Sequence, residues 1–351
     1  MSDAFPVPET RVLAVASHVV SGNVGNKIAV FALQSMGCDV AALNTVQFSN
    51  HTGYGQWKGS RVTAEEILEL YAGLKQSCLD DFDMMLSGYI PGAAAVEAVG
   101  KIGLDLRRQN EKKPGSFFWV LDPVMGDNGR LYVASEVVPA YKSIIKYADL
   151  IVPNQFEAEQ LSGVKITDMA SLKAAVTELH SRYGIPHVII TSVSFDQANQ
   201  TGETKQLCVV GSTRTSAGNA RFFKVVFPVI DCYFSGTGDM FGALTVVRMR
   251  QAVHRAGAAL QNTPSWLSPD NVRPTDLPLA RAAELVVASL HEVLDKTAES
   301  MDRIGDRADA SAGVTDEQQA RAAKSKAAEL KLVRNLGSLK HPDVRFKAVE
   351  A

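Results

Sequence analysis

Five consecutive residues, Ser235-Gly236-Thr237-Gly238-Asp239, have the types and spacing for phosphate chemistry, and an apolar helical run follows them. Two glycines at a helix start let backbone N–H groups converge on one point, where the helix N-terminus adds positive potential. This arrangement favours a bound phosphate. A carboxylate repels phosphate, so Asp239 is instead placed to act as general base for a hydroxyl that attacks a γ-phosphorus. The structural alternative is that Asp239 only caps the helix.

A second polar group, Pro153-Asn154-Gln155-Phe156-Glu157, follows a buried apolar run. The ends of strands in open α/β sheets face the ligand crevice. Glu157 could hold Mg²⁺ through water, and Asn154 could contact nucleotide phosphate. The spacing of three also fits a capping box with Asn154 as N-cap, and these residues alone favour that structural role.

A third polar group, Asp122-Pro123-Val124-Met125-Gly126-Asp127, also follows an apolar run. Two acids separated by proline and glycine indicate a loop that binds metal or faces phosphate. An Asx-turn explains the same residues equally well.

Two clusters near the N-terminus are rich in small hydroxyls and amides, and they cover residues 17–26 and 46–54. Each follows an apolar run that we interpret as a strand. Side chains of these types are what recognition of a polar ring substrate requires. Ordinary loop hydrophilicity explains either cluster taken alone.

Several other functions are excluded by the sequence. A net charge of −2 provides no basic field for nucleic acid or anionic lipid. Residues 22–27 lack the four-residue gap of a P-loop, no GxGxxG follows the first strand, and the histidines never pair at zinc spacing. The four cysteines are unpatterned, and the first apolar run is too short for a signal or a membrane span. We therefore expect a cytoplasmic protein without a membrane partner.

The elements that must position these residues alternate between short strands and helices. We expect strands that begin at Arg11, Asp39, Asp83, Phe117, Asp149 and His187. We expect helices over residues 26–36, 64–77, 93–109, 155–161 and 171–183, the second of them with a capping box of Thr63 and Glu66. This alternation predicts an α/β fold whose central sheet is mostly parallel and has helices on both faces.

The pattern changes after residue 192. Two apolar runs, QLCVVGS and RFFKVVFP, flank a polar turn and predict an antiparallel hairpin. Residues 261–278 are rich in proline, serine and asparagine, which predicts a surface insertion within a single domain. We expect a helix over 281–296, a mobile polar segment near 306–319, and a final helix rich in alanine, lysine and glutamate.

Taken together, these segments resemble the eukaryotic-type pyridoxal kinases of the ribokinase-like class. The resemblance rests on SHVVSGNVGNKIAVFALQSMGCDVAALNTVQFSNHTGYGQWKG, SGY, LDPVMGD, LIVPNQFEAEQLSG, VIITS and GTGDMF, which occur in the family's order. It covers about residues 11–260 and returns at ELKLVRN near the C-terminus. It implies a ribokinase-like domain over residues 1–351 that forms a homodimer. It also implies ATP-dependent phosphorylation of the 5′-hydroxyl of pyridoxal, pyridoxine and pyridoxamine.

The same resemblance implies roles for individual residues. Asp239 would be the catalytic base and Gly236, Thr237 and Gly238 the anion hole. Ser17 and Thr52 would hydrogen-bond the polar groups of the pyridine ring, with Val46, Phe48 and Tyr89 beside it. Contacts to ATP would come from Asn154, Thr191, Ser192 and Thr237. Asp127 and Glu157 would serve Mg²⁺, and Asp122 with Thr191 would serve a monovalent cation, K⁺ or Na⁺.

Two alternatives and one departure accompany this interpretation. Another ribokinase-like enzyme, such as a hydroxymethylpyrimidine kinase, is disfavoured by the polar cluster at 46–54. A non-catalytic protein that binds pyridoxal phosphate is disfavoured by Asp239 and the metal-binding acids. The departure is Val152, which stands where the family has a hydroxyl residue near the cation.

Overall fold

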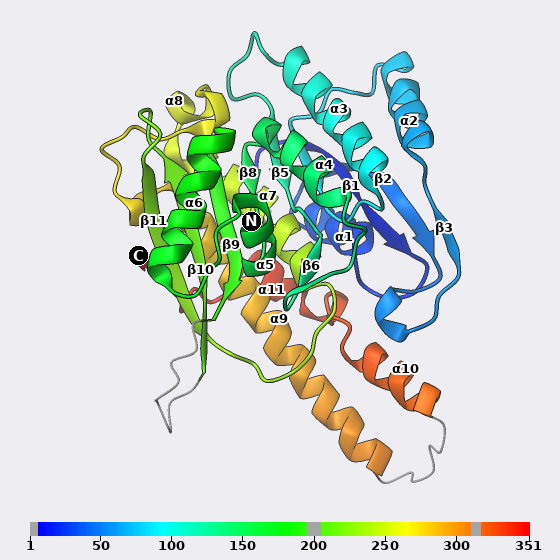
Figure 1. The fold of residues 1–351 in the computed structure, drawn as a ribbon. Helices are drawn as coiled ribbons and strands as arrows, with labels where there is room; N and C mark the ends of the chain where they lie inside the picture. Colours follow the sequence, from blue (N-terminus) through cyan, green and yellow to red (C-terminus); the bar gives the residue numbers. More distant parts are fainter. Residues whose placement is uncertain (1–5, 195–204, 310–316) are drawn as a thin grey trace, which may run out of the picture.

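A single mixed sheet runs through the middle of the molecule (Figure 1). The computed structural model describes residues 6–194, 205–309 and 317–351. Within these residues the strand order is β12-β11-β10-β9-β8-β5-β4-β1-β2-β3. The strands are β1 (Arg11–Val19), β2 (Asp39–Phe48), β3 (Gly59–Arg61), β4 (Met84–Ser87), β5 (Phe118–Leu121), β8 (Leu150–Ile151), β9 (His187–Val193), β10 (Gln206–Arg214), β11 (Ala220–Pro228) and β12 (Ala348–Glu350).

The predicted mostly parallel sheet with an antiparallel portion is confirmed. Neighbouring strands from β2 through β9 pair in parallel, whereas β10 pairs antiparallel with both β9 and β11. β4 and β5 are buried along their whole length, as strands covered on both faces should be. In β1, Val12 and Ala14 pack into the core on one face of the sheet, while Leu13 and Val15 pack on the other.

Helices cover both faces of the sheet, as predicted. One face carries α1 (Asn26–Ser35), α7 (Thr237–Ala256) and α9 (Pro278–Asp309). The other carries α2 (Ala64–Gln76), α3 (Ala93–Gln109), α4 (Val137–Ile144), α5 (Gln155–Ser162) and α6 (Met169–Tyr183). Thr63 and Glu66 form the predicted capping box at α2. Sequence patterns did not reveal α4 or the small hairpin of β6 (Gly126–Asp127) and β7 (Arg130–Leu131), because elements this short carry little periodicity.

We expected residues 261–278 to form a surface insertion. This prediction is wrong for the part of the segment that packs into the core. Trp266 is 1% exposed and stacks on Phe118 of β5 with ring centroids 4.2 Å apart. Its indole Nε1 donates to the carbonyl oxygen of Gly115 (2.9 Å), and the neighbouring Ser265 hydroxyl donates to Asp149 (2.6 Å). The segment, which follows the short α8 (Ala258–Gln261), therefore completes the core beside β5.

The polar segment near 306–319 is helical at both ends. Helix α9 continues to Asp309, and α10 (Glu317–Ala327) begins inside the range expected to be mobile. Residues 310–316 lie outside the described part of the chain, so that prediction stays open there. In Figure 1 the C-terminal part of α9 extends away from the body of the molecule, and α10 leads back toward it.

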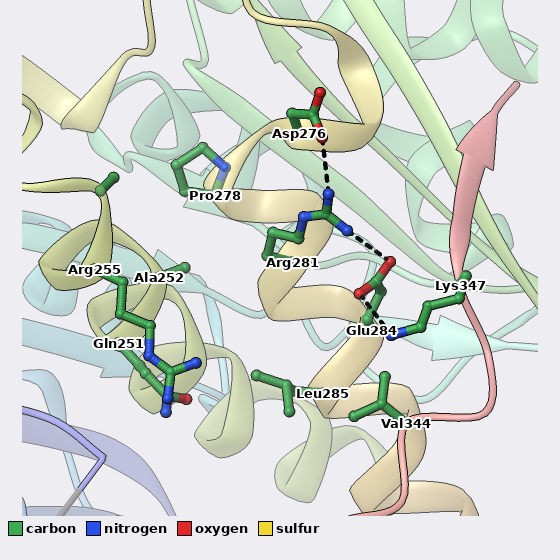
Figure 2. A pocket seen from close by; sticks show the side chains of 11 residues that line it. Gln251, Ala252, Arg255, Asp276, Pro278, Arg281, Glu284, Leu285, Val344 and Lys347 are labelled. Atoms are coloured by element: carbon green, nitrogen blue, oxygen red, sulfur yellow. Dashed lines mark hydrogen bonds and ion pairs between the residues drawn. The ribbon is translucent and has the colours of Figure 1, made fainter.

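The C-terminal tail is fixed to α9 by one buried carboxylate, Glu284. It accepts a hydrogen bond from the backbone N–H of Ala348 (2.9 Å) and pairs with Arg281 and Lys347 (Figure 2). These contacts hold β12 against β11 after the short α11 (Leu336–Lys340). They line a cavity of about 410 Å³ beside the last turn of α7. None of the helices in the described residues is both long and apolar enough to cross a membrane.

Candidate active site

The candidate site lies at the point in the sheet where the chain changes the side on which it adds strands. From β1 the chain moves to β2 on one side and then to β4 on the other. In open α/β sheets this switch leaves a crevice outside the carboxyl ends of the two diverging strands, and ligands bind there. Ser17 is near the end of β1, and Gly88 directly follows β4. The cavity in Figure 2 is at the opposite end of α7 from this crevice and is not part of it.

Asp239 faces this crevice from the first turn of α7. The N-cap of the helix is Gly236, so the alternative that Asp239 is the N-cap is wrong. A Cβ atom on Gly88 would lie 3.9 Å from Asp239 Oδ1, and the backbone N–H of Gly25 hydrogen-bonds the carboxyl group. Burial raises the pKa of Asp239 to about 6, and the hydrogen bond from Gly25 opposes this shift. The group is therefore ionised at neutral pH but is a stronger base than an ordinary aspartate.

The glycine turn before Asp239 depends on its lack of side chains. Gly236 has a φ of 84°, and a Cβ there would lie 2.5 Å from the carbonyl oxygen of Asn23. No side chain in the described part of the chain caps the N-terminus of α7. The first backbone N–H groups of this 20-residue helix are therefore free of side-chain partners and can receive an anion.

Asp122 lies close to Asp239 and Glu157 and forms an acidic cluster with them. Burial raises the pKa of Asp122 well above its usual value, and the charges of Glu157 and then Asp239 raise it further. A cation would relieve this repulsion. Among the residues that the structure describes, however, no three acidic, histidine or cysteine side chains converge closely enough to ligate a metal by themselves. The donor set therefore fits a cation that keeps water in its coordination shell, as Mg²⁺ commonly does.

Glu157 and Asn154 form the capping box that the sequence favoured. Glu157 Oε2 accepts from the backbone N–H of Asn154 (2.9 Å), and Oε1 accepts from Met125 (2.9 Å). Asn154 Nδ2 donates in turn to the carbonyl oxygen of Gly126 (2.7 Å). Burial raises the pKa of Glu157 to about 7, while these backbone donors lower it. Both residues thus tie the 122–127 loop to α5.

Asp127 lies on β6 and takes part in a local turn. Its carboxylate accepts from the backbone N–H of Asn128 (2.7 Å), one residue on, whereas an Asx-turn uses the backbone N–H two residues on. Its charge also raises the pKa of Glu157, so the two acids are close. The described hydrogen bonds of Asp127 therefore do not form the Asx-turn that was the structural alternative, and Asp127 and Glu157 lie near enough to share a cation.

Three of the residues expected beside a substrate ring meet in one small apolar cluster. Val46, Phe48 and Tyr89 pack there with Val19 and Val24, apart from the two main cores. Ser17 lies directly against Gly25, where a Cβ atom would lie 2.1 Å from the carbonyl oxygen of Ser17. Thr52 is exposed and begins the 3₁₀ turn η1 (Thr52–Tyr54).

The residues expected to contact nucleotide fall into two places. Thr191 of β9 donates its backbone N–H to the carbonyl oxygen of Pro153 (3.0 Å), which places it beside Asn154. Ser192 is exposed on the same strand. Thr237 is the first residue of α7, and within the described ranges no hydrogen bond connects it to the other three residues. Sequence reasoning missed Gly25 and Gly88 because their role depends on closeness to Asp239, which spacing along the chain does not encode.

Comparison with known proteins gives a consistent result. A family model described as phosphomethylpyrimidine kinase matches residues 88–263. Human pyridoxal kinase is 36% identical over 298 residues, which cover 82% of this chain and 86% of the human protein. Pyridoxal kinase from Arabidopsis thaliana is 33% identical over 352 residues, which cover 99% and 97% of the two chains. The chain belongs to the pyridoxal kinase family.

A solved structure agrees with this assignment. Pyridoxal kinase from Leishmania donovani, in complex with ADP and pyridoxamine, matches with a TM-score of 0.76 and 30% identity. The match covers 98% of this chain and all of that one. The predicted ribokinase-like fold, pyridoxal kinase function and ATP as co-substrate are thereby confirmed. The pyrimidine-kinase model begins at residue 88, so it omits both clusters that we expect to recognise the ring.

Proposed function

We propose that this pyridoxal kinase uses Asp239 to deprotonate the 5′-hydroxyl of pyridoxal, pyridoxine or pyridoxamine. As the proton moves to the carboxylate, the hydroxyl oxygen bonds to the γ-phosphorus of ATP, the bond to the β-phosphate oxygen breaks, and ADP leaves. The position of Asp239 carries the proposal: its carboxyl group lies in the crevice between β1 and β4, one turn from the free end of α7.

The glycine turn supplies the electrostatic half of this mechanism. The backbone N–H groups at Gly236, Thr237 and Gly238 have no side-chain cap, so they can stabilise negative charge on the transferring phosphoryl group. Because they are fixed by the helix, they need no reorganisation when that charge develops. Asn154, Thr191 and Ser192 would hold the rest of ATP along the ends of β8 and β9.

The vitamer would lie over the apolar cluster of Val46, Phe48 and Tyr89. Ser17 and Thr52 would hydrogen-bond the polar groups of its ring. Ser17 adjoins Gly25, and Gly25 hydrogen-bonds Asp239, so the same short segment can orient the ring and the base. This shared support would keep the 5′-hydroxyl within reach of Asp239.

Two cations complete the proposal. Asp127 and Glu157 would hold Mg²⁺ through its water ligands, and Asp122 with Thr191 would hold K⁺ or Na⁺. When bound, Mg²⁺ neutralises charge on the β- and γ-phosphate oxygens. The repulsion that raises the pKa of Asp122 supports a cation at this place. Val152 is buried in the core and presents no oxygen, so this chain has one fewer polar group there than the family pattern.

We also propose a cytoplasmic homodimer. The dimer rests on the family resemblance. The four cysteines are free, and two of them, Cys78 and Cys232, are exposed, which fits a reducing compartment.

A coupled assay of ADP formation with each vitamer tests the function, with Asp239→Asn as the central variant. Loss of the base should lower kcat about 10²–10⁴-fold while ATP still binds. Asp231→Asn is the matched control, because Asp231 precedes the same turn but is exposed. Wild-type kcat in Asp239→Asn would refute the base. Faster turnover of hydroxymethylpyrimidine than of any vitamer would favour the pyrimidine-kinase alternative suggested by the family model.

A further inference from the structure

A segment from the C-terminal part of the chain lies against three loops of the candidate site. We call residues 321–330 the strap; they comprise the end of α10 and the residues that follow it. The strap contacts the segment after β1, the turn η1 and the glycine turn before α7. These loops hold, in order, Gly22 and Asn23, Thr52 and Tyr54, and Ser235. The strap thus contacts both the loops proposed to bind the vitamer and the turn proposed to bind the phosphoryl group.

The side chain of Glu329 connects the first two loops. The Tyr54 hydroxyl donates to Glu329 Oε1 at 2.7 Å. This carboxylate and burial together raise the pKa of Tyr54, so the hydroxyl keeps its proton and remains a donor. The same carboxylate oxygen lies 2.9 Å from the place where a Cβ on Gly22 would stand. Glu329 therefore fills the gap between the segment after β1 and η1.

The backbone of the strap connects to the glycine turn. The backbone N–H of Ser235 donates to the carbonyl oxygen of Ala328 (3.1 Å), and Ser235 pairs with Glu329 in a parallel bridge. Asn23 Nδ2 donates to the carbonyl oxygen of Leu330 (3.0 Å). Asn23 in turn lies against Gly236. Two adjacent strap residues therefore contact both parts of the site. Ala328 binds Ser235 at the start of the proposed anion hole, and Glu329 binds Tyr54.

The strap itself is firmly supported. Ala328 and Leu330 are 1% and 0% exposed, and Leu330 belongs to the core beneath α7 and α9. The backbone N–H of Lys331 donates to the Thr297 hydroxyl of α9 (3.2 Å). From α10, the Ser325 hydroxyl donates to the carbonyl oxygen of Gly53 (3.4 Å). A contact anchored at this depth can position a loop that is otherwise exposed.

We propose that Glu329 is a positioning residue for the vitamer, acting through Tyr54 on the turn that carries Thr52. This inference rests on the proposed vitamer site. Gly55 donates its backbone N–H to the carbonyl oxygen of Thr52 (2.9 Å), so η1 is one closed turn and Tyr54 cannot shift without Thr52. The Tyr54–Glu329 bond fixes this turn before the vitamer arrives, and the vitamer then binds without the cost of ordering it.

Steady-state kinetics on six variants tests the inference: Glu329→Ala, Glu329→Gln, Tyr54→Phe, the double variant Tyr54→Phe/Glu329→Ala, Thr52→Ala and Lys326→Ala. Glu329→Ala and Tyr54→Phe should each raise the KM for pyridoxal about tenfold, the effect of losing a hydrogen bond to a charged group. The KM for ATP should stay within about twofold, because the Glu329 side chain binds Tyr54 and none of the residues proposed to contact ATP. The double variant should be no worse than Glu329→Ala, since both changes remove one interaction.

Two variants separate positioning from mere stability. Glu329→Gln should restore most of the affinity, because its amide oxygen still accepts from Tyr54. Lys326→Ala, an exposed change on the same strap, should leave both KM values unchanged. Tyr54→Phe removes only a hydroxyl group, so it tests the Tyr54–Glu329 hydrogen bond even if Glu329→Ala fails to fold.

Three results would overturn the inference. If Thr52→Ala raises the KM for pyridoxal while Glu329→Ala and Tyr54→Phe do not, the vitamer site stands and the strap has no part in it. If both KM values rise together with a lower melting temperature, Glu329 is only a structural residue. If Thr52→Ala also leaves the KM for pyridoxal unchanged, the proposed vitamer site and the role of Glu329 are both wrong.

Discussion

Glu157 is buried and Asp239 is half-buried beside the same crevice, and the hydrogen bonds of the two carboxyl groups differ. Glu157 accepts from the backbone N–H groups of Asn154, Met125 and Gly126, so most of its lone pairs are committed to holding a loop. Asp239 has one backbone donor, Gly25, and therefore keeps lone pairs for a substrate proton. This difference supports the proposal that Asp239 is the base and that Glu157 has a supporting role.

Glu157→Gln should disturb the 122–127 loop as well as the cation. In glutamine one of the two carboxylate oxygens is replaced by an NH2 group, so one backbone N–H loses its acceptor. An unsatisfied buried donor of this kind lowers the free energy of unfolding by about 1–3 kcal/mol. We expect a lower free energy of unfolding in urea and a higher Mg²⁺ concentration for half-maximal activity. Glu159→Gln is the control, since Glu159 is equally buried in α5 but binds Ile166 and Lys165 instead. Equal Mg²⁺ titrations for the two variants would leave Glu157 as a helix cap only.

Ser17→Ala should weaken vitamer binding far more than ATP binding. A ring polar group left without its partner costs about 1–3 kcal/mol, or roughly ten- to a hundredfold in affinity. Calorimetry with pyridoxal and with a non-hydrolysable ATP analogue measures the two dissociation constants separately. Ser21→Ala, an exposed change in the same segment, should alter neither. A selective loss of ATP affinity in Ser17→Ala would mean that the two halves of the site are exchanged.

At the scale of elements, short segments outside the sheet support its strands. The 3₁₀ turn η3 (Pro264–Trp266) inserts Trp266 against Phe118, and its Ser265 carbonyl oxygen accepts from His187 (2.7 Å). His187 lies at the start of β9. This turn therefore connects β5 with β9, two of the strands whose far ends carry site residues.

Trp266→Ala should lower the free energy of unfolding by about 3–5 kcal/mol, as large-to-small changes in a core do. Trp266→Phe should cost less, because it keeps the stacked ring and loses only the N–H that binds Gly115. Urea denaturation of the three proteins measures both values. Wild-type stability of Trp266→Ala would restore the view of 261–278 as a surface insertion.

Two buried histidines should make the fold sensitive to acid. Burial lowers the pKa of His180 to about 4 and of His187 to about 3. Below about pH 6.5 the unfolded chain binds a proton at each imidazole while the folded protein does not. Each histidine should therefore lower the free energy of unfolding as pH drops from 6.5 toward 4, by up to about 1.4 kcal/mol per pH unit, while the raised pKa values of Asp239 and Glu157 act in the opposite direction.

Denaturant titrations between pH 7.5 and 4.5 check this slope. His187→Asn should reduce the slope, whereas His254→Gln should not, because His254 is exposed. Identical slopes for the wild type and His187→Asn would show that the His187 imidazole takes up its proton in the folded state.

At the scale of the whole molecule, the site gathers loops from distant parts of the chain around one edge of the sheet. The acids come from the segments after β5 and β8, the proposed vitamer residues from β1, β2 and the segments after β2 and β4, and the base from α7. In the proposed mechanism, cations neutralise the charge that accumulates there. A chelator that binds Mg²⁺ should abolish vitamer-dependent ADP formation, and added Mg²⁺ should restore it.

This metal dependence should be separable from folding. The melting temperature in chelator should change little, since the sheet and its two cores involve no metal ligand. Replacement of K⁺ by tetramethylammonium should also lower activity if Asp122 and Thr191 hold a monovalent cation. Undiminished turnover in chelator would contradict the proposed role of Asp127 and Glu157.

The sequence by itself determined the local structure and the family. Alternating apolar runs and helical periods predicted the parallel strands and most helices, and α3 has the predicted bounds. Thr63 and Glu66 marked a capping box because its partners are three residues apart. The motifs from residue 17 to Asp239 identified the kinase family. The reaction requires particular residue types, and the motifs that contain them occur in the family's order.

Only the tertiary structure decided which distant residues meet. Gly25 reaches Asp239, Trp266 stacks on Phe118, and Glu329 binds Tyr54 across 275 positions of the chain. Prolines and serines near Trp266 predicted a surface loop, because composition reports average polarity and cannot show that one indole is buried. Hydrophobic periodicity in the sequence relates only residues that are a few positions apart. Contacts between remote segments depend on how the sheet and helices pack, which no local pattern encodes.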